Sequence, residues 1–283
     1  MNKKNVKNYR KFKDNFILGL IYISSFITFS ILVWILVYVL SRGLPQINME
    51  FLSSAPKGDD GGGIFPMIIS TLYLIIISIA FSAPIGVLSA IYLTEYAKNK
   101  RLIKIIRFAT ESLAGIPSII YGLFGMVFFV VFLKMGWSII SGAITLSIMV
   151  LPTIIRSSEE ALKSVPKSYK EASLSLGATK LRTIYKCILP SAFPGILTAI
   201  ILSVGRIIGE TAAIYLTVGM APYIPKSIFE SGRTLSVHLY MLAKEGISFD
   251  KAFATASVLI IMIFMINVLS NYVANKMNTT NKA

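Results

Sequence analysis

Six long apolar stretches, separated by shorter polar segments, dominate the sequence. Each is long enough to cross the hydrocarbon core of a bilayer, about 30 Å thick, which takes about 20 helical residues. The predicted spans cover residues 16–40, 64–93, 116–133, 137–155, 192–220 and 252–274. The second and fifth exceed what a bilayer needs, so we expect them to begin or end outside the lipid. The pattern predicts an all-α polytopic membrane protein with six transmembrane helices.

The composition agrees with this prediction. Hydrophobic residues make up 55% of the chain, charged residues 14%, and the mean hydropathy is +0.72. Soluble domains carry about 25% charged residues, so a soluble globular enzyme is not expected. The one cysteine, Cys187, excludes an internal disulfide framework and a cysteine-based zinc site, and no metal site or P-loop is predicted.

Positively charged residues predict which side of the membrane each loop faces. The net charge is +15, and the chain has 28 Lys and Arg residues. Twenty of them lie in the two tails and in the connections after the second and fourth spans, whereas seven lie in the opposite loops. By the positive-inside rule both termini are predicted to be cytoplasmic. Loops facing anionic lipid account for the basic charge, so no nucleic-acid partner is expected.

This topology divides the chain into segments. A cytoplasmic basic tail (1–15) precedes the first transmembrane helix (16–40). An external loop (41–63) follows, and its Pro and Gly residues predict a flexible surface segment. A transmembrane domain of five helices (64–274) comes next, and a cytoplasmic tail (275–283) ends the chain. The first apolar run is longer than that of a signal peptide, so we expect it to be retained.

Three connections carry more specific expectations. Residues 101–109 predict an amphipathic helix at the membrane interface, with Arg107 among the cations that point away from its apolar face. Lys134 and Gly136 predict a tight hairpin. Residues 235–243 predict a short helix on the membrane surface, in which His238 is expected to be an ordinary polar surface residue.

The cytoplasmic loop between the fourth and fifth spans, residues 156–191, is rich in helix signals. Ser157 and Glu160 fit a capping box that starts a short helix. Pro166 suits the first turn of the next helix, and Gly177 suits the position after its end. A further short helix is expected from residue 180 toward 189.

The helix after Pro166 would carry one compact face of small and apolar side chains. Its members are Tyr169, Ala172, Ser173 and Leu176, spaced i, i+3, i+4, i+7. Nothing in the loop itself is expected to cover this face, which suits docking into the groove of a partner. The alternative is an ordinary cytoplasmic helical hairpin.

The same loop resembles the EAA motif of permease subunits in binding-protein-dependent ABC importers. The matching residues are Glu171, Ala172, Ser173, Gly177, Leu189 and Pro190. Ser173 replaces the second alanine of the motif, and Cys187 stands where isoleucine is usual. The resemblance implies a type I ABC importer permease fold whose loop forms coupling helices on an ATPase subunit. That subunit would bind ATP, so this chain is expected to be a transport subunit without a cofactor and not an enzyme.

An ionisable pair lies within the fifth predicted span. Arg206 and Glu210 are four residues apart and are expected to meet on one helix face. One such charge at mid-membrane costs about 2.5–3.5 kcal/mol, so the pair is expected to face a polar cavity or the seam with another subunit. Gly205 and Gly209 would let another helix approach closely. The candidate pathway residues are Arg206, Glu210, Thr211 and Ser203; the alternative is an ion pair that only joins helices.

The chemistry of this pair indicates a tetrahedral oxyanion. The planar guanidinium of an arginine forms bidentate hydrogen bonds and stays protonated. A neighbouring carboxylate favours hydrogen phosphate over sulfate, because phosphate near neutral pH retains a proton to donate to Glu210. Selectivity for phosphate is therefore a hypothesis that rests on Glu210.

Several segments are similar to the PstA group of permeases in phosphate ABC importers. They are residues 63–66, 70–74, 116–122, 206–212 and 234–238. The resemblance implies a second permease subunit (PstC-like), ATPase subunits (PstB-like) and an external phosphate-binding protein (PstS-like), working by alternating access in a bacterial cell membrane. The alternatives are an ABC permease for another oxyanion such as sulfate or molybdate, a secondary transporter or channel that works alone, and an intramembrane enzyme.

Overall fold

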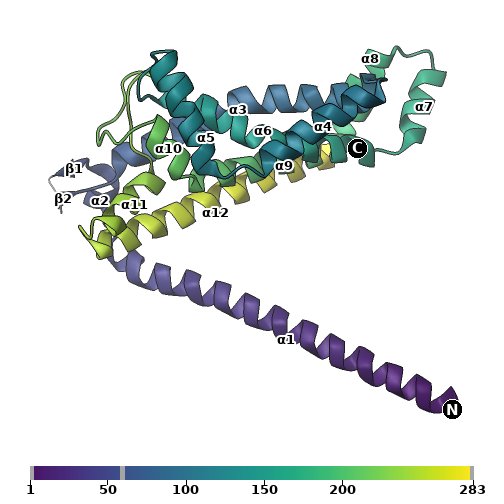
Figure 1. The fold of residues 1–283 in the computed structure, drawn as a ribbon, viewed down its shortest axis with the longest axis horizontal. Helices are drawn as coiled ribbons and strands as arrows, with labels where there is room; N and C mark the ends of the chain where they lie inside the picture. The colour runs from purple at the N-terminus through teal and green to yellow at the C-terminus, as the bar shows by residue number, and fades with distance from the viewer. Residues whose placement is uncertain (1–2, 58–60, 281–283) are drawn as a thin grey trace.

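The chain folds into a bundle of helices from which one long helix stands apart (Figure 1). The computed structural model describes residues 3–57 and 61–280. The helical elements are α1 (Lys3–Gly43), η1 (Leu44–Gln46), α2 (Met49–Ser53), α3 (Phe65–Ile91), η2 (Tyr92–Tyr96), α4 (Lys100–Ala114), α5 (Ser118–Gly125), η3 (Met126–Phe132), α6 (Ile139–Ser164), α7 (Lys167–Ser175), α8 (Lys180–Thr183), η4 (Ile184–Ile188), α9 (Leu189–Gly209), α10 (Ala212–Thr217), α11 (Leu235–Lys244) and α12 (Phe249–Thr280). The strands β1 (Pro56–Lys57) and β2 (Gly61–Gly62) pair antiparallel.

Helix α6 lies at the centre of the bundle, between α3 and α9. Its buried residues include Leu146, Met149 and Ile154, which belong to the main apolar core. Gly86 permits the close approach of α3, because a Cβ atom at that position would lie 2.6 Å from Cγ2 of Ile154. Helix α12 packs against α9 and α11, and α10 packs against α5.

Five helical segments are long and apolar enough to cross a membrane, and a bent pair adds a sixth. The five are Lys13–Gln46, Phe65–Tyr96, Ile139–Ser164, Lys180–Gly209 and Phe249–Ser270, and the bent pair is Lys100–Ala114 with Ser118–Phe132. The mostly helical membrane architecture is confirmed, with five candidate spans, or six if the bent pair is counted as one span. The third predicted span corresponds to α5 and η3, and the preceding amphipathic helix α4 meets α5 at 99° next to Pro117. The fifth predicted span is interrupted, because α9 ends at Gly209.

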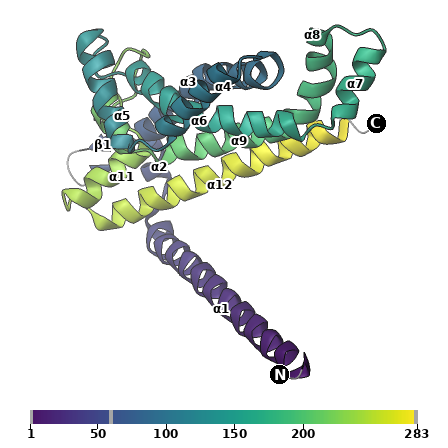
Figure 2. The ribbon, with the colours of Figure 1, turned by 45° about the vertical axis from the view of Figure 1, so that its right-hand side comes forward.

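Helix α1 diverges from the bundle along most of its length (Figures 1 and 2). It meets the bundle near its end, where Gly43 lies against the backbone of Phe253 and Ser257 donates to the carbonyl of Val39 at 3.3 Å. None of its apolar 18-residue window is buried within the chain. Contact of such a long apolar surface with water is unfavourable, so lipid or another protein is needed to cover it.

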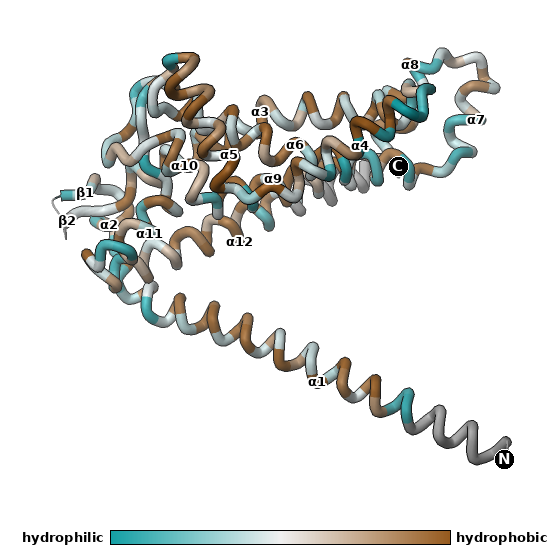
Figure 3. The backbone as a smooth tube through the Cα atoms, viewed as in Figure 1, coloured by the Kyte–Doolittle hydropathy of each residue, from teal (hydrophilic) through white to brown (hydrophobic). Residues whose placement is uncertain are grey.

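The connecting segments gather at two opposite ends of the bundle (Figure 1). Helices α7 and α8 lie at one end, called here the α7 end, and α2, α11 and the β-hairpin lie at the other, the α11 end. Apolar residues fill the helices between them, and hydrophilic residues are concentrated in α7, β1 and the loops (Figure 3). The start of α1 and the end of α12 both lie on the side of the molecule that carries α7 (Figure 1).

Two loop predictions were wrong. Ser157 and Glu160 lie inside α6, which continues to Ser164, so no capping box starts a helix there. The loop 41–63 is structured where the chain is described, because Asn48 caps α2 by accepting from the N–H of Phe51 at 2.7 Å and the β-hairpin follows. The predicted tight turn is confirmed, with φ values of 54° at Lys134 and 66° at Gly136.

Candidate transport site and coupling loop

The predicted coupling helix forms as α7, directly after Pro166. Gly177 lies two residues beyond its end with φ of +82°, a conformation that glycine adopts without strain. The N–H of Gly177 donates to Leu174 at 2.9 Å, and the N–H of Ala178 donates to Ser173 at 3.2 Å. These two bonds make a Schellman motif, which satisfies the last carbonyls of the helix. The predicted position of Gly177 at the C′ end of this helix is therefore confirmed.

The other motif residues lie on α7 and at the start of α9. Glu171 and Ala172 are exposed, and Leu176 has 89% of its surface exposed. Ser173 instead faces inward, where its hydroxyl lies 2.9 Å from that of Thr183. Leu189 and Pro190 are partly buried in the first turn of α9. The expected apolar face is thus open at Leu176 and covered at Ser173, whose small side chain lets α7 and α8 approach.

The loop is tied to the end of α3 by contacts that the sequence analysis missed. Nζ of Lys170 lies 2.5 Å from Oε2 of Glu95, whose side chain is 7% exposed. Nζ of Lys180 donates to the backbone carbonyl of Glu95 and lies 4.5 Å from the ring centroid of Tyr96. One signal was available, because Glu95 is a lone carboxylate in a stretch of basic residues.

The predicted meeting of Arg206 with Glu210 on one helix face does not occur. Helix α9 ends at Gly209, and the backbone of Glu210 is extended with ψ of 130°. Its carboxylate turns toward the next helix and accepts from the N–H of Ala213 at 3.3 Å. Neither Arg206 nor Glu210 belongs to the ion pairs Arg107–Glu159, Arg156–Glu160, Lys163–Glu159 and Lys170–Glu95. Periodicity predicted one continuous helix, and the break at Glu210 separates the two side chains.

The end of α9 leaves an exposed arginine next to irregular backbone within an apolar span. Arg206 is exposed in the last turn of α9, where a cation is favoured by the helix dipole. Thr211 is partly buried, with its hydroxyl 3.5 Å from the carbonyl of Gly209. Irregular backbone at membrane depth is tolerated only inside protein or beside a water-filled cavity. Arg206 and the backbone around Glu210 are therefore candidates for lining such a cavity.

Gly205 and Gly209 have free space beside them, whereas Ser203 is buried. No atom outside their own helix segment lies within 4 Å of where a Cβ would be at Gly205 or Gly209. This leaves room for another helix against α9. Ser203 is fully buried and donates to the carbonyl of Ala199 at 2.9 Å. Ser203 thus lies apart from the exposed Arg206 in this chain.

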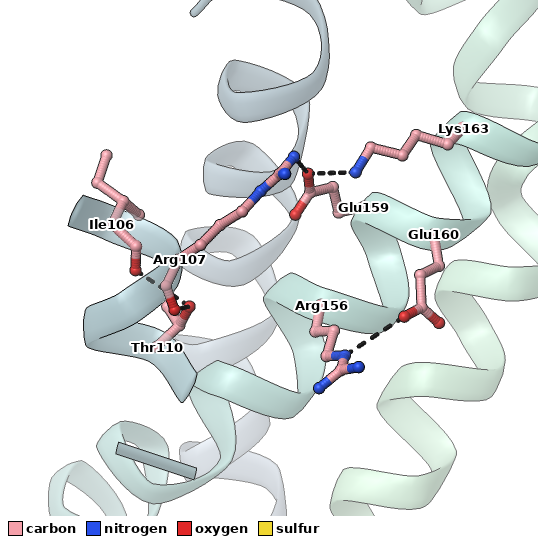
Figure 4. A network of polar contacts seen from close by, with 7 residues as sticks. All are labelled: Ile106, Arg107, Thr110, Arg156, Glu159, Glu160 and Lys163. Atoms are coloured by element: carbon pink, nitrogen blue, oxygen red, sulfur yellow. Dashed lines mark hydrogen bonds and ion pairs between the residues drawn. The ribbon is translucent and has the colours of Figure 1, made fainter. Parts of the chain in front are cut away.

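A polar network near the α7 end joins α4 to α6 (Figure 4). Glu159, with 8% of its side chain exposed, pairs with Arg107 and accepts from Nζ of Lys163 at 2.6 Å. Arg107 was expected only to point away from the apolar face of its helix, and its contact with Glu159 was not predicted from the sequence. Arg156 and Glu160 form a separate exposed pair at 3.3 Å.

His238 lies in a small cavity at the α11 end. The cavity has a volume of about 240 Å³ and is lined in part by Arg233, His238, Glu245 and Lys251. His238 is 7% exposed, so the expectation of a surface histidine was wrong. Burial, with the charges of Arg233 and Lys251, lowers the pKa of His238 from 6.5 to about 4. Nδ1 of this neutral ring accepts from Nη1 of Arg233 at 3.5 Å. In the described residues, no group of three His, Cys, Asp or Glu side chains is placed to hold a metal ion.

Comparison with known proteins places the chain in a transporter family. The family described as "Binding-protein-dependent transport system inner membrane component" matches residues 82–279. The "Probable ABC transporter permease protein YqgI" of Bacillus subtilis is 33% identical in an alignment 280 residues long, which covers 93% of this chain and 95% of the relative. The "Phosphate transport system permease protein PstA" of Pasteurella multocida is 31% identical over 266 residues, covering 92% and 94% of the two chains.

Solved structures of ABC transporters have the same fold. A chain of the bacterial alginate ABC transporter, in complex with an alginate pentasaccharide-bound periplasmic protein, aligns with a TM-score of 0.69. That alignment has 16% identity and covers 95% of this chain and 97% of the other. A chain of the inward-facing MetNI methionine ABC transporter aligns with a TM-score of 0.60 and 21% identity over 76% and 94%.

The type I ABC importer permease fold is therefore confirmed, and the protein is a transport subunit and not an enzyme. Its partners are, in general terms, a substrate-binding protein and an ATPase. The chain belongs to the family of binding-protein-dependent transport system inner membrane components.

Proposed function

We propose that this chain is a membrane-spanning permease subunit of an ATP-driven importer of inorganic phosphate. The observation that carries the proposal is the exposed Arg206 at the break between α9 and α10, in an otherwise apolar span. Relatives named as phosphate transport system permeases, at about a third identity over most of the chain, support the substrate.

The site suits phosphate because it offers both a fork of donors and an acceptor. The guanidinium of Arg206 can bind two oxygens of a tetrahedral anion at once. Glu210 uses one carboxylate oxygen to accept from the N–H of Ala213 at 3.3 Å, and the other can accept the remaining proton of hydrogen phosphate. Sulfate has no such proton, so the carboxylate repels it. Phosphate passes through a low-affinity site of this kind on its way across the bundle.

The remaining wall of the passage comes from a second, PstC-like permease subunit. The open surface at Gly205 and Gly209 supports this arrangement, because a helix of the partner can reach the backbone of α9 there. The α7 end faces the cytoplasm, since the basic residues of the tails and of α4, α7 and α8 are concentrated there. Both termini are then cytoplasmic, in the membrane of a bacterial cell.

Transport follows alternating access. A PstS-like binding protein delivers phosphate at the α11 end, and PstB-like ATPase subunits dock on the exposed side of α7, around Glu171, Ala172 and Leu176. ATP binding closes the ATPase pair, and the movement of α7 re-orients the bundle around Arg206. The chain itself breaks no covalent bond.

Arg206→Gln tests the proposal in the complete importer. The variant should assemble with its partners and lose ATP-driven phosphate uptake, whereas Arg206→Lys should retain part of it because the charge remains. Lys134→Gln, a loss of charge at the external turn, is the matched control and should transport normally. Normal uptake by Arg206→Gln would refute the proposed role.

A further inference from the structure

The coupling helix is tied to the third helix by one nearly buried ion pair. Glu95 belongs to the wide turn η2 that ends α3, and it contacts Lys170 of α7 at 2.5 Å. Lys180 of α8 adds a hydrogen bond to the backbone carbonyl of the same residue. Helices α7 and α8 therefore both contact Glu95 at the end of α3.

The contact between Glu95 and Lys170 is a nearly buried ion pair and not simple apolar packing. A carboxylate that is 7% exposed has lost most of its water, and burial of a charge is costly unless a partner neutralises it. Glu95 lines a cavity of about 220 Å³ together with Lys163, Lys167 and Lys170. Apolar residues would join the two helices without that cost, so the pair is suited to fixing one relative position of α7 and α3.

The opposite end of α3 is tied to the break in the fifth span. The hydroxyl of Thr71 accepts from the N–H of Leu235, the first residue of α11, at 3.0 Å. The hydroxyl of Ser236, the next residue, donates to the carbonyl of Glu210 at 2.6 Å. Thr71 is 2% exposed and Ser236 5%, so water does not compete for these bonds.

Contacts with α6 keep α3 from bending independently between its two ends. Pro84 interrupts the hydrogen bonding within α3, which would otherwise allow a hinge. Two residues later, Gly86 lies directly against Ile154 of α6. Ser147 of α6 also donates to the carbonyl of Ser78 at 2.9 Å. α3 and α6 therefore move together, and α6 leads into α7 through Val165 and Pro166.

We propose that Glu95 and Thr71 are positioning residues, and that α3 carries the displacement of α7 to the backbone at Glu210. The Lys170–Glu95 pair transmits the movement at the cytoplasmic end, and the Thr71–Leu235 and Ser236–Glu210 bonds transmit it at the other. This inference rests on the proposed function, because it assigns a consequence to ATPase docking on α7.

The first test separates coupling from hydrolysis. In proteoliposomes holding the complete importer, Glu95→Gln should hydrolyse ATP at the wild-type rate while phosphate transported per ATP falls by about tenfold. The exchanged pair Glu95→Lys with Lys170→Glu should restore much of the ratio. Glu160→Gln, at an exposed pair on α6, is the matched control. An unchanged ratio in Glu95→Gln overturns the proposal, as does a parallel loss of both activities, which a purely structural role would give.

The second test addresses the other end of α3. Thr71→Val keeps the shape of the side chain and removes the acceptor for Leu235, so it should lower phosphate transported per ATP as Glu95→Gln does. Ser82→Ala is the control, because the hydroxyl of Ser82 bonds within α3, to the carbonyl of Ser78 at 2.7 Å. A normal ratio in Thr71→Val would remove Thr71 from the proposal.

A third measurement needs no phosphate and so distinguishes this inference from the proposed function. Spin labels at Lys134→Cys and Tyr240→Cys, in a Cys187→Ser background, report the distance between the turn after η3 and α11. A non-hydrolysable ATP analogue should shift this distance in the wild-type complex and not in Glu95→Gln. An equal shift in both overturns the transmission through α3. Failure of the wild-type complex to take up phosphate would contradict only the proposed function.

Discussion

The carboxylate of Glu159 joins α4 to α6 by binding Arg107, a residue 52 positions earlier in the chain (Figure 4). It also accepts from Lys163 on its own helix at 2.6 Å. Arg107 is 44% exposed and Glu159 8% exposed, so the carboxylate depends on its partners more than the arginine does. This contact holds the amphipathic helix α4 against the bundle.

Glu159→Gln should lower the stability of the purified chain. The substitution leaves two cations without a counter-charge, and we expect a loss of about 1–3 kcal/mol in the free energy of unfolding. Thermal unfolding in detergent measures the effect. Glu160→Gln, at a pair whose side chains are 72% and 67% exposed, should change the midpoint little. Equal midpoints for the two variants would contradict the importance of the Arg107–Glu159 contact.

Gly177→Ala should disturb the end of α7. An alanine is strained at φ of +82° by about 1 kcal/mol, and the bonds that end the helix would shift. We expect weaker co-purification of the ATPase subunits and slower uptake. Gly177→Asn should recover much of both, because asparagine tolerates this conformation. Gly115→Ala serves as the control, since the φ of Gly115 is −85°.

Stability should depend on pH through His238. Its folded pKa, about 4, lies below the unfolded value of about 6.5, so the unfolded chain takes up the proton first. The contribution of the neutral ring is fully present above pH 6.5 and is lost as the pH falls toward 4, by up to about 3 kcal/mol. Thermal unfolding between pH 8 and 4 should show this slope, and His238→Asn should flatten it. An identical slope in the variant would assign the effect to other groups.

Glu210→Gln should weaken discrimination between phosphate and sulfate. The amide removes the negative charge that repels sulfate, so sulfate should inhibit phosphate uptake about tenfold more strongly than in the wild type. Competition in vesicles holding the complete importer measures this ratio. Glu50→Gln, an exposed carboxylate on α2, should leave the ratio unchanged. If sulfate inhibits the Glu210→Gln variant no more strongly than the wild type, Glu210 does not determine the selectivity for phosphate over sulfate.

The sequence predicted the features that depend on local pattern. The lengths of the apolar runs predicted where the membrane spans lie. Pro166 and Gly177 predicted the ends of α7, because residues that begin or end a helix act within a few positions. The break at Glu210 was not predictable from periodicity, since the apolar pattern continues through residue 220. The partners of Glu95, Glu159 and His238 were also missed, because each contact joins residues of different helices or depends on burial that only the folded bundle creates.

The divergence of α1 from the bundle has a consequence for how mutations in it should be interpreted. Apart from its last turns, which contact α12, this helix buries none of its apolar window within the chain and so contributes little to the free energy of unfolding of the isolated protein. Substitutions along it that preserve hydropathy should therefore be silent in the purified subunit. Their effects should emerge only in the assembled membrane complex, so stability assays on the isolated chain would misclassify harmful changes in this helix as neutral.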